Sequence, residues 1–208
     1  NDASRYVGKA VNRVEDPALV SGTVEFIDNF SLPGMLHCAI LRSPHPHARI
    51  LSVKVDAALA AEGVVAVLTG EDVGRWCNPC FTAPEGWGNY CLAVGKVRFV
   101  GEPVVAVAAS SRYLAEDALE LVDIEYELLP PVADAGQAMA TGAPLVFEER
   151  GTNVMLDRTY TWGELERVFA EADRVVSRRF RWNRVGANPT ETFGCVCRWD
   201  LADNSLVC

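Results

Sequence analysis

The stretch from residue 104 to residue 128 constrains the fold more than any other part of the sequence. Residues 104–109 are an apolar run of Val and Ala, which is typical of a buried strand, and residues 123–128 again have the character of a strand. Residues 111–122 between them predict an amphipathic helix. Its apolar stripe carries Leu114, Ala115, Ala118, Leu121 and Val122. The order strand, helix, strand requires a sheet beneath the helix, so the chain combines α and β elements.

Three further runs, at residues 36–42, 50–56 and 64–68, predict strands because each lies between Gly, Pro, Ser or Asp residues. Residues 50–56 alternate in polarity, as a strand with one wet face does. The expected inner face carries Leu51, Val53 and Val55, and the expected solvent face carries Ser52, Lys54 and Asp56. These runs predict an α+β fold.

Two adjacent prolines, Pro130 and Pro131, end regular structure after this region, because proline lacks a backbone donor and disfavours helix before it. We therefore expect two domains, residues 1–135 and residues 136–208. The second is predicted to begin another α+β body. Its expected elements are a helix at 163–173, a half-exposed strand at 174–182, a strand at 192–200, a turn at 201–204 and a strand from 205.

Charge and hydropathy exclude two classes of function. Nineteen Lys and Arg against 28 Asp and Glu give a net charge of −9, which repels a phosphate backbone and argues against nucleic-acid binding. The longest apolar runs are far shorter than the roughly 20 residues that span a bilayer, so we expect no membrane span. Seven cysteines are an odd and sparse set, which favours a reducing cytoplasm over a disulfide scaffold.

Both ends of the sequence predict a longer polypeptide. Residue 1 is not Met and no apolar leader follows it, so we expect an upstream segment to have been removed or omitted. A strand begins at residue 205 and stops at Cys208, and we expect it to start a sheet whose remainder follows.

Cys77 and Cys80 have the only spacing in the chain with a recognised metal or redox meaning. Of the other thiols, Cys91 alone lies nearby, whereas a closed zinc site needs about four ligands. We interpret these cysteines as structural or incidental thiols, with zinc binding and redox exchange as the alternatives. The histidines lie elsewhere in the sequence. The loop with His45 and His47 is interpreted as a structural turn or a contact surface, because no third metal ligand accompanies the two imidazoles.

Glu102 lies between Gly101 and Pro103, just before the buried run. A buried carboxyl with a raised pKa can be functional, but a satisfied structural Glu is the favoured interpretation. The sequence contains no phosphate-binding loop, dinucleotide-binding glycine motif, nucleophile elbow or paired-His zinc motif. From the residues alone the chain is an α+β domain without an assigned activity.

Six segments together resemble the opening of the molybdenum-binding large subunit of the xanthine dehydrogenase, aldehyde oxidase and carbon monoxide dehydrogenase family. Their order and spacing match over about residues 5–135. The segments are residues 8–16, 19–28, 33–50, 63–73, 100–104 and 115–130. The resemblance implies an α/β hammerhead domain with a mixed sheet.

Residues 140–208 resemble the start of the molybdopterin-binding domain of the same family. Residues 169–173 resemble one of its helices, and residues 188–192 resemble a motif usually read as Pro-Met-Glu-Pro. Glu191 matches that motif, whereas Thr190 and Thr192 replace its Met and second Pro. The resemblance therefore leaves the branch of the family open, and the Cys77 to Cys80 loop has no counterpart in it.

The resemblance implies an oxidoreductase that hydroxylates an aldehyde, an N-heterocycle or a similar carbon centre with oxygen from water. It implies a molybdopterin-type molybdenum cofactor in the complete subunit, with iron-sulfur clusters and FAD in partner domains or subunits, and a homo-oligomeric complex. We expect this chain to act as scaffold and subunit contact, with no catalytic residue and no cofactor of its own. Glu102 and Glu191 are the candidates for lining the cofactor cleft. The alternatives are a stand-alone interaction module and a small metal protein that uses Cys77, Cys80 and Cys91.

Overall fold

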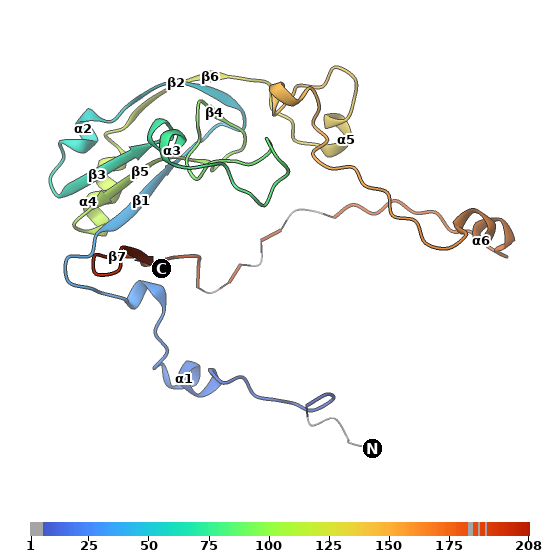
Figure 1. The fold of residues 1–208 in the computed structure, drawn as a ribbon, viewed down its shortest axis with the longest axis horizontal. Helices are drawn as coiled ribbons and strands as arrows, with labels where there is room; N and C mark the ends of the chain where they lie inside the picture. Colours follow the sequence, from blue (N-terminus) through green and yellow to red (C-terminus); the bar gives the residue numbers. More distant parts are fainter. Residues whose placement is uncertain (1–5, 183–184, 187, 190) are drawn as a thin grey trace. The chain divides into compact units, whose positions relative to one another are not determined.

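The computed structural model describes residues 6–182, 185–186, 188–189 and 191–208. The chain divides into two compact units, which we describe separately. The sheet unit is Gly34–Asp173, and the terminal unit comprises Asn1–Pro33 together with Arg174–Cys208. Figure 1 shows the elements of both units along the chain.

The sheet unit contains two three-stranded sheets. One has the order β1 (His37–Arg42), β5 (Pro103–Ala109), β3 (Val64–Thr69). The other has the order β4 (Lys96–Val97), β2 (Ala48–Lys54), β6 (Asp123–Leu128). The strands and α4 (Arg112–Leu119) confirm the α+β class.

The expected mixed sheet is corrected by the strand pairing, since every pairing in the described part of the chain is antiparallel. The elements β5, α4 and β6 follow one another as predicted, but β5 and β6 belong to different sheets. Both edges of β5 are already paired, one with β1 and the other with β3, so β6 pairs with β2 instead.

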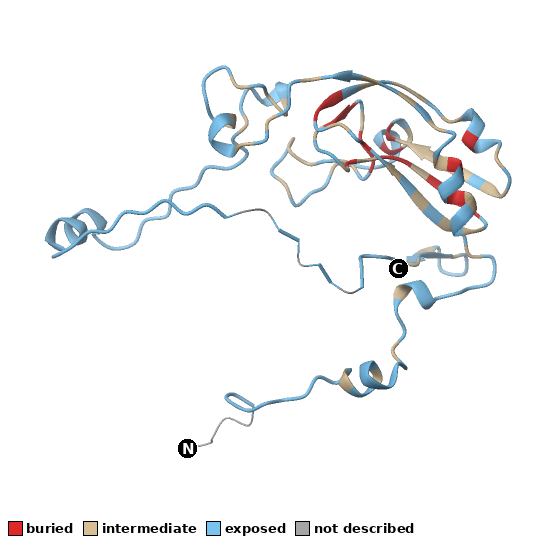
Figure 2. Ribbon diagram, turned by 180° about the vertical axis from the view of Figure 1, so that it is seen from behind, coloured by how far each residue is buried: buried red, intermediate tan, exposed pale blue. Residues whose placement is uncertain are grey.

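The core lies around β5 and beneath α4, where Figure 2 shows the buried residues gathered. Fully buried valines fill it: Val97, Val104, Val105 and Val107. Ala115 and Ala118 are buried on the inner stripe of α4, and their small side chains let the helix lie close to β1 and β5. Ser111 caps the helix by accepting a hydrogen bond from the Leu114 amide.

The prediction that Leu121 belongs to the buried stripe of α4 is wrong. Leu121 is 48% exposed because α4 ends at Leu119, two residues before the helical period would have turned Leu121 inward. Leu119 packs against the core in addition to Val122.

The face assignment in β2 is also corrected at Leu51 and at Ser52, which is half-buried rather than on the solvent face. Leu51 is 56% exposed, because the register shifts between Ile50, which pairs with Tyr126, and Ser52, which pairs with Glu125. A bulge of this kind leaves one residue without a partner and changes the alternation of the strand. Val53 and Lys54 keep their predicted sides. Asp56 starts the short helix α2 (Asp56–Leu59) rather than ending the strand.

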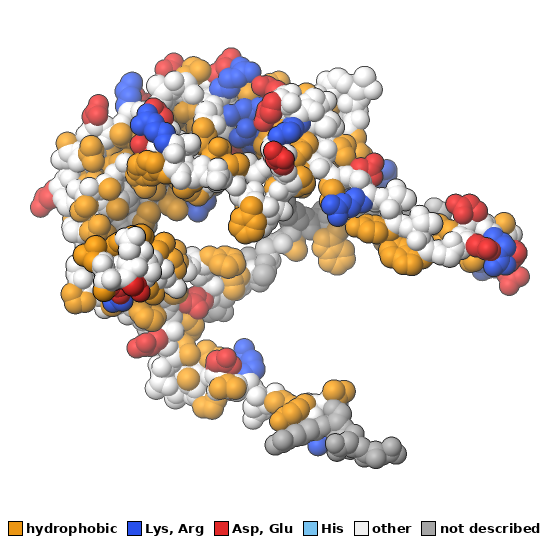
Figure 3. Space-filling model, in the orientation of Figure 1, with side chains coloured by type: hydrophobic (Ala, Val, Ile, Leu, Met, Phe, Trp, Pro, Cys, Tyr) orange, Lys and Arg blue, Asp and Glu red, His pale blue; other side chains and the backbone are white. Residues whose placement is uncertain are grey.

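Four further helical segments complete the sheet unit: α3 (Gly70–Trp76), α5 (Ala135–Ala138), η2 (Glu148–Arg150) and α6 (Leu165–Glu171). The predicted helix at 163–173 is confirmed as α6, although its apolar residues Leu165, Val168 and Phe169 are all exposed. Figure 3 shows hydrophobic side chains on the surface of the chain that leads to this helix, where Met155, Tyr160 and Trp162 are exposed.

The terminal unit contains α1 (Asp16–Ser21), η1 (Ile27–Asn29) and the hairpin β7 (Arg198–Asp200) and β8 (Ser205–Val207). The predicted turn and following strand are confirmed, whereas the strand predicted at 192–200 is limited to β7. The strand predicted at 174–182 is wrong, since these residues are exposed and outside any described sheet. Alternating polarity can give a segment one apolar face, but a strand is stable only when it pairs with another strand. None of the described helices has the length and apolar character needed to cross a membrane.

Candidate functional site

Glu102 is held in a tight turn that joins β4 to β5. Gly101 has a φ of +89°, a conformation that side chains rarely adopt, which explains the glycine before the carboxyl. The Gly101 amide donates to the Ser43 carbonyl at 2.8 Å, and the Ser43 amide donates back to the Glu102 carbonyl at 2.9 Å. The turn is therefore fixed to the end of β1.

The Glu102 side chain is 2% exposed and folds back over its own turn. Its Oε2 accepts a hydrogen bond from the Arg98 backbone amide. Burial raises the pKa of this carboxyl above its ordinary value, and the amide bonds from Arg98 and Phe99 and the Arg98 charge oppose the rise. The structure supports the favoured interpretation of a hydrogen-bonded structural Glu.

A cavity of about 260 Å³ lies against Glu102. The Arg98 guanidinium lies over the Phe147 ring, 4.4 Å from its centroid, and its Nε is buried with no hydrogen-bond partner in the described structure. Phe147 also contacts Trp87, with ring centroids 5.1 Å apart. Arg150 also lines the cavity, and its Nε donates to the Gly86 carbonyl at 3.1 Å. Two arginines, two carboxylates and aromatic rings therefore line this cavity.

The cavity contains groups that sequence reasoning missed. Arg98 and Phe147 are 49 residues apart, and no spacing rule links an isolated Arg to a Phe at that distance. Lys96 in β4, two residues before Arg98, is buried outside the cavity lining, and desolvation lowers its pKa while Glu148 opposes the fall at an Nζ to Oε1 distance of 3.8 Å. A stronger signal was present for Glu102, because the turn glycine precedes it in sequence.

Glu191 lies in the terminal unit, where its Oε1 accepts a hydrogen bond from the Ile27 amide at 2.8 Å. Ile27 is the first residue of η1, whose amide groups need partners at that end. At Gly194 a Cβ would lie 2.7 Å from a methyl carbon of Ile27, so this glycine permits close packing of the two segments. The carboxyl of Glu191 thus joins two segments that are far apart in sequence.

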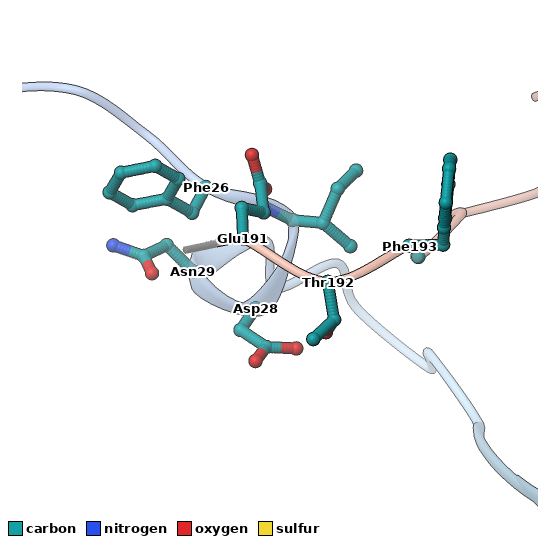
Figure 4. A pocket seen from close by; sticks show the side chains of 8 residues that line it. Phe26, Asp28, Asn29, Glu191, Thr192 and Phe193 are labelled. Carbon is teal, nitrogen blue, oxygen red and sulfur yellow. The ribbon is translucent and has the colours of Figure 1, made fainter. Parts of the chain in front are cut away.

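Figure 4 shows the cavity that these two segments enclose, with a volume of about 290 Å³. Phe26 and Glu191 lie near one another on one side, and Phe193 lies apart from them. Asp28 adds a second carboxylate to the lining, whose residues are Phe26, Ile27, Asp28, Asn29, Glu191, Thr192, Phe193 and Gly194. Thr190, the other departure from the family motif, lies outside the described residues.

Cys77, Cys80 and Cys91 are free and exposed. The Cys80 thiol contacts the Thr82 hydroxyl at 3.0 Å, which lowers the pKa of Cys80 through side-chain and backbone hydrogen bonds. No group of three or more His, Cys, Asp or Glu that could hold a metal ion occurs within the described residues. The zinc and redox alternatives for these cysteines stay hypotheses.

The two histidines of the 43–47 loop pack into the sheet unit. His47 is buried and its Nδ1 lies 2.8 Å from the Pro130 carbonyl oxygen, while its Nε2 is buried without a partner in the described structure. His45 meets the Tyr126 ring edge-on, with centroids 4.9 Å apart. These contacts are those of a structural turn.

Two family models match the chain one after the other. Residues 21–130 match the model described as aldehyde oxidase and xanthine dehydrogenase, a/b hammerhead domain. Residues 146–208 match the model described as molybdopterin cofactor-binding domain. The chain therefore belongs to the aldehyde oxidase and xanthine dehydrogenase family, as its motifs indicated. The domain limits 1–135 and 136–208 stay a prediction.

The chain is similar to large subunits of molybdenum hydroxylases. It is 36% identical to the nicotine 6-hydroxylase large subunit of Paenarthrobacter nicotinovorans, over 96% of this chain and 25% of the relative. It is 37% identical to the carbon monoxide dehydrogenase large chain of Hydrogenophaga pseudoflava, over 92% of this chain and 26% of the relative. Among solved structures, quinoline 2-oxidoreductase from Pseudomonas putida 86 matches with a TM-score of 0.82 and 38% identity, over 96% of this chain and 26% of that chain. The chain spans about a quarter of the length of these relatives.

The family implies a molybdenum cofactor whose pterin carries an anionic phosphate, which requires cationic or amide donors. The cavity at Glu191 does not fit this group, because the carboxylates of Asp28 and Glu191 repel an anion and no Lys or Arg in the lining balances them. The cavity at Glu102 does not fit it either, since Arg98 and Arg150 are balanced there by Glu102 and Glu149. No chemical step is therefore assigned to the described residues.

Proposed function

We propose that this chain is part of a molybdenum hydroxylase large subunit in which its own residues provide scaffold and subunit contacts. The observation that carries the proposal is the succession of the two family matches, hammerhead and cofactor-binding, along one chain. The reaction proposed for the complete subunit is hydroxylation of an aldehyde, N-heterocycle or similar carbon centre with oxygen from water. The names of the nicotine and quinoline enzymes favour an N-heterocycle as the first substrate to test.

The scaffold role is supported by what the two candidate carboxylates already do. Glu102 is used by its own turn, and Glu191 is used to hold η1. In each case one carboxyl oxygen already accepts a hydrogen bond from a backbone amide, which supports a structural role. We therefore expect the 208-residue chain alone to oxidise neither aldehydes nor heterocycles.

The cofactors and partners proposed for the complete complex follow from the same family. The molybdenum cofactor would be held by residues outside the described cavities, and iron-sulfur clusters and FAD would lie in partner domains or subunits. The name of the nicotine 6-hydroxylase large subunit supports such partners, since a large subunit implies smaller ones. We further propose that the complex is homo-oligomeric. We also propose that it lies in the cytoplasm, which the free cysteines support.

The test is purification of the tagged protein from its native cells. Mass spectrometry identifies the chains that accompany it, and elemental analysis measures molybdenum and zinc. We expect molybdenum together with chains that carry iron-sulfur and flavin sites, and dye reduction by that complex with an aldehyde or an N-heterocycle. Pure protein with stoichiometric zinc and no molybdenum would overturn the proposal. Turnover by the isolated chain would overturn the scaffold role alone.

A further inference from the structure

Two thiols face each other across the hairpin of the terminal unit. The register pairs Arg198 with Val207, Trp199 with Leu206 and Asp200 with Ser205. The next pair in this register is Cys197 and Cys208, and their Sγ atoms are 3.1 Å apart. A third thiol, Cys195, interacts with Cys197.

We propose that Cys197 and Cys208 form a disulfide when the protein meets a low-molecular-weight disulfide such as oxidised glutathione. Directly opposed residues of antiparallel strands have Cα atoms about 4.5–5.5 Å apart, which lies within the range of about 4.4–6.8 Å seen in disulfides. Closing the sulfur distance from 3.1 Å to about 2.05 Å therefore requires side-chain rotation without a change in backbone pairing.

The hairpin holds the two thiols in register through its own side chains. Arg198 pairs with Asp200 at 3.3 Å, and Asp200 Oδ1 accepts from the Ala202 amide at 3.0 Å. The Ser205 hydroxyl donates to Asp203 at 2.6 Å, and Asn204 takes the left-handed conformation with a φ of 55°. These contacts fix the turn at one end of the hairpin, and the thiols lie at the other.

The exchange has two steps. One cysteine thiolate attacks a sulfur of glutathione disulfide, which forms a mixed disulfide and releases one glutathione thiolate. The second cysteine then attacks the protein sulfur of that mixed disulfide, which forms the Cys197 to Cys208 bond and releases the second glutathione. Two protein thiols are oxidised, one glutathione disulfide is reduced to two thiols, and the two protons end on glutathione.

The second step is favoured by the short distance between the two sulfur atoms. The hydrogen bond with Cys208 raises the pKa of Cys197, which lowers the thiolate fraction of Cys197 at neutral pH. The reaction is therefore run at about pH 8.5, close to the ordinary pKa of a free thiol.

The test is peptide mapping of the folded, purified protein after incubation with glutathione disulfide. Remaining thiols are blocked with iodoacetamide before digestion with trypsin, which cuts after Arg198 and so separates Cys197 from Cys208. We expect loss of the two alkylated peptides and a linked peptide whose mass is two hydrogen masses below the sum of the same peptides with Cys197 and Cys208 unalkylated. Dithiothreitol should restore both alkylated peptides.

Single variants assign the bond. Cys195→Ser should retain the linked peptide, whereas Cys197→Ser and Cys208→Ser should each lose the Cys197 to Cys208 link while circular dichroism shows an unchanged fold. Cys38 and Cys91 serve as internal references and should give alkylated or glutathione-bound peptides, without a link to another peptide of the chain. The proposal is overturned if Cys197 and Cys208 stop at mixed disulfides with glutathione, if both stay fully alkylated, or if fragment ions place the wild-type bond at Cys195.

Discussion

At the scale of single residues, Glu102 shows how burial and hydrogen bonding act against each other on one carboxyl. Desolvation favours its neutral form, whereas the Arg98 and Phe99 amides favour the carboxylate. The net result is a pKa above the ordinary 4.5. Because the folded state binds its proton more tightly than the unfolded state does, the stabilising contribution is complete below pH 4.5 and is lost as the pH rises through the raised pKa.

Replacing Glu102 by Gln tests this balance, since Gln keeps one acceptor oxygen for the Arg98 amide but cannot ionise. We expect the Tm of E102Q relative to the wild type to rise as the pH increases from about 4 to about 8. Thermal unfolding followed by circular dichroism at several pH values measures the difference. A difference that does not change with pH would contradict the raised pKa.

The sequence predicted part of this residue-level chemistry. The sequence Gly101, Glu102, Pro103 before a buried run indicated a structural Glu. In the structure Glu102 is hydrogen-bonded within its own turn. The stacking of Arg98 on Phe147 could not be predicted, because it brings the residue after β4 against the residue before η2, which are far apart in sequence. Long-range side-chain contacts of this kind carry no periodic signal.

At the scale of elements, α3 contains two glycines in very different surroundings. A Cβ at Gly70 would lie 1.9 Å from the Ala93 backbone oxygen, whereas a Cβ at Gly74 would meet Val94 side-chain atoms at 3.5 and 3.7 Å, an ordinary contact distance. At Gly70, α3 therefore approaches the backbone of residues 93–94 closely, whereas at Gly74 the nearest atoms belong to the Val94 side chain.

The matched substitutions Gly70→Ala and Gly74→Ala should separate the two sites. We expect G70A to lower the free energy of unfolding by about 1–3 kcal/mol through overpacking against the backbone. We expect G74A to be neutral or to stabilise by up to about 1 kcal/mol, since Ala favours the helix. Urea unfolding of both variants is the measurement, and equal effects would argue against the close approach at Gly70.

A second pair of variants tests the corrected stripe of α4. Ala115→Asp places an unpaired charge at a fully buried position and should cost roughly 3 kcal/mol or more. Leu121→Asp changes a half-exposed residue beyond the helix and should cost less than about 1 kcal/mol. Both are compared by denaturant midpoint, and the reverse order would restore Leu121 to the core.

Helices and strands were predicted correctly where a local run of residues defines them. The prediction failed where the structure depends on which distant strands pair. The Val-rich run at 104–109 and the polar alternation at 123–128 gave β5 and β6. The bulge at Leu51 and the division of the strands between two sheets depend on which edge of β5 or β2 is free, and that is not written in local sequence. Residues 174–182 alternate in polarity but have no partner strand in the described structure, and they therefore do not form a strand.

At the scale of the whole molecule, burial is distributed unevenly between the two units. Every buried residue of the described chain lies in the sheet unit. The four arginines between Arg174 and Arg181 are exposed and belong to no described helix or strand. Backbone outside hydrogen-bonded elements is where proteases cut first.

We expect brief digestion with trypsin to cut first at Arg158 and within residues 174–181. The arginines at 42, 49 and 98 lie in or beside the paired strands and should be cut last. Mass spectrometry of timed samples gives the order of cutting. Early cleavage after Arg49 or Arg98 would show that the sheets open more readily than their pairing indicates.

The hydrogen bond between Ile27 and Glu191 joins residues 164 positions apart. At a translation speed of roughly 5–20 residues per second, a ribosome needs on the order of 10–30 s to pass from the first of these residues to the second. The strands of the sheet unit have all been synthesised by then. The N-terminal segment leaves the ribosome first, yet its helical turn must wait for its carboxylate until most of the chain has been made.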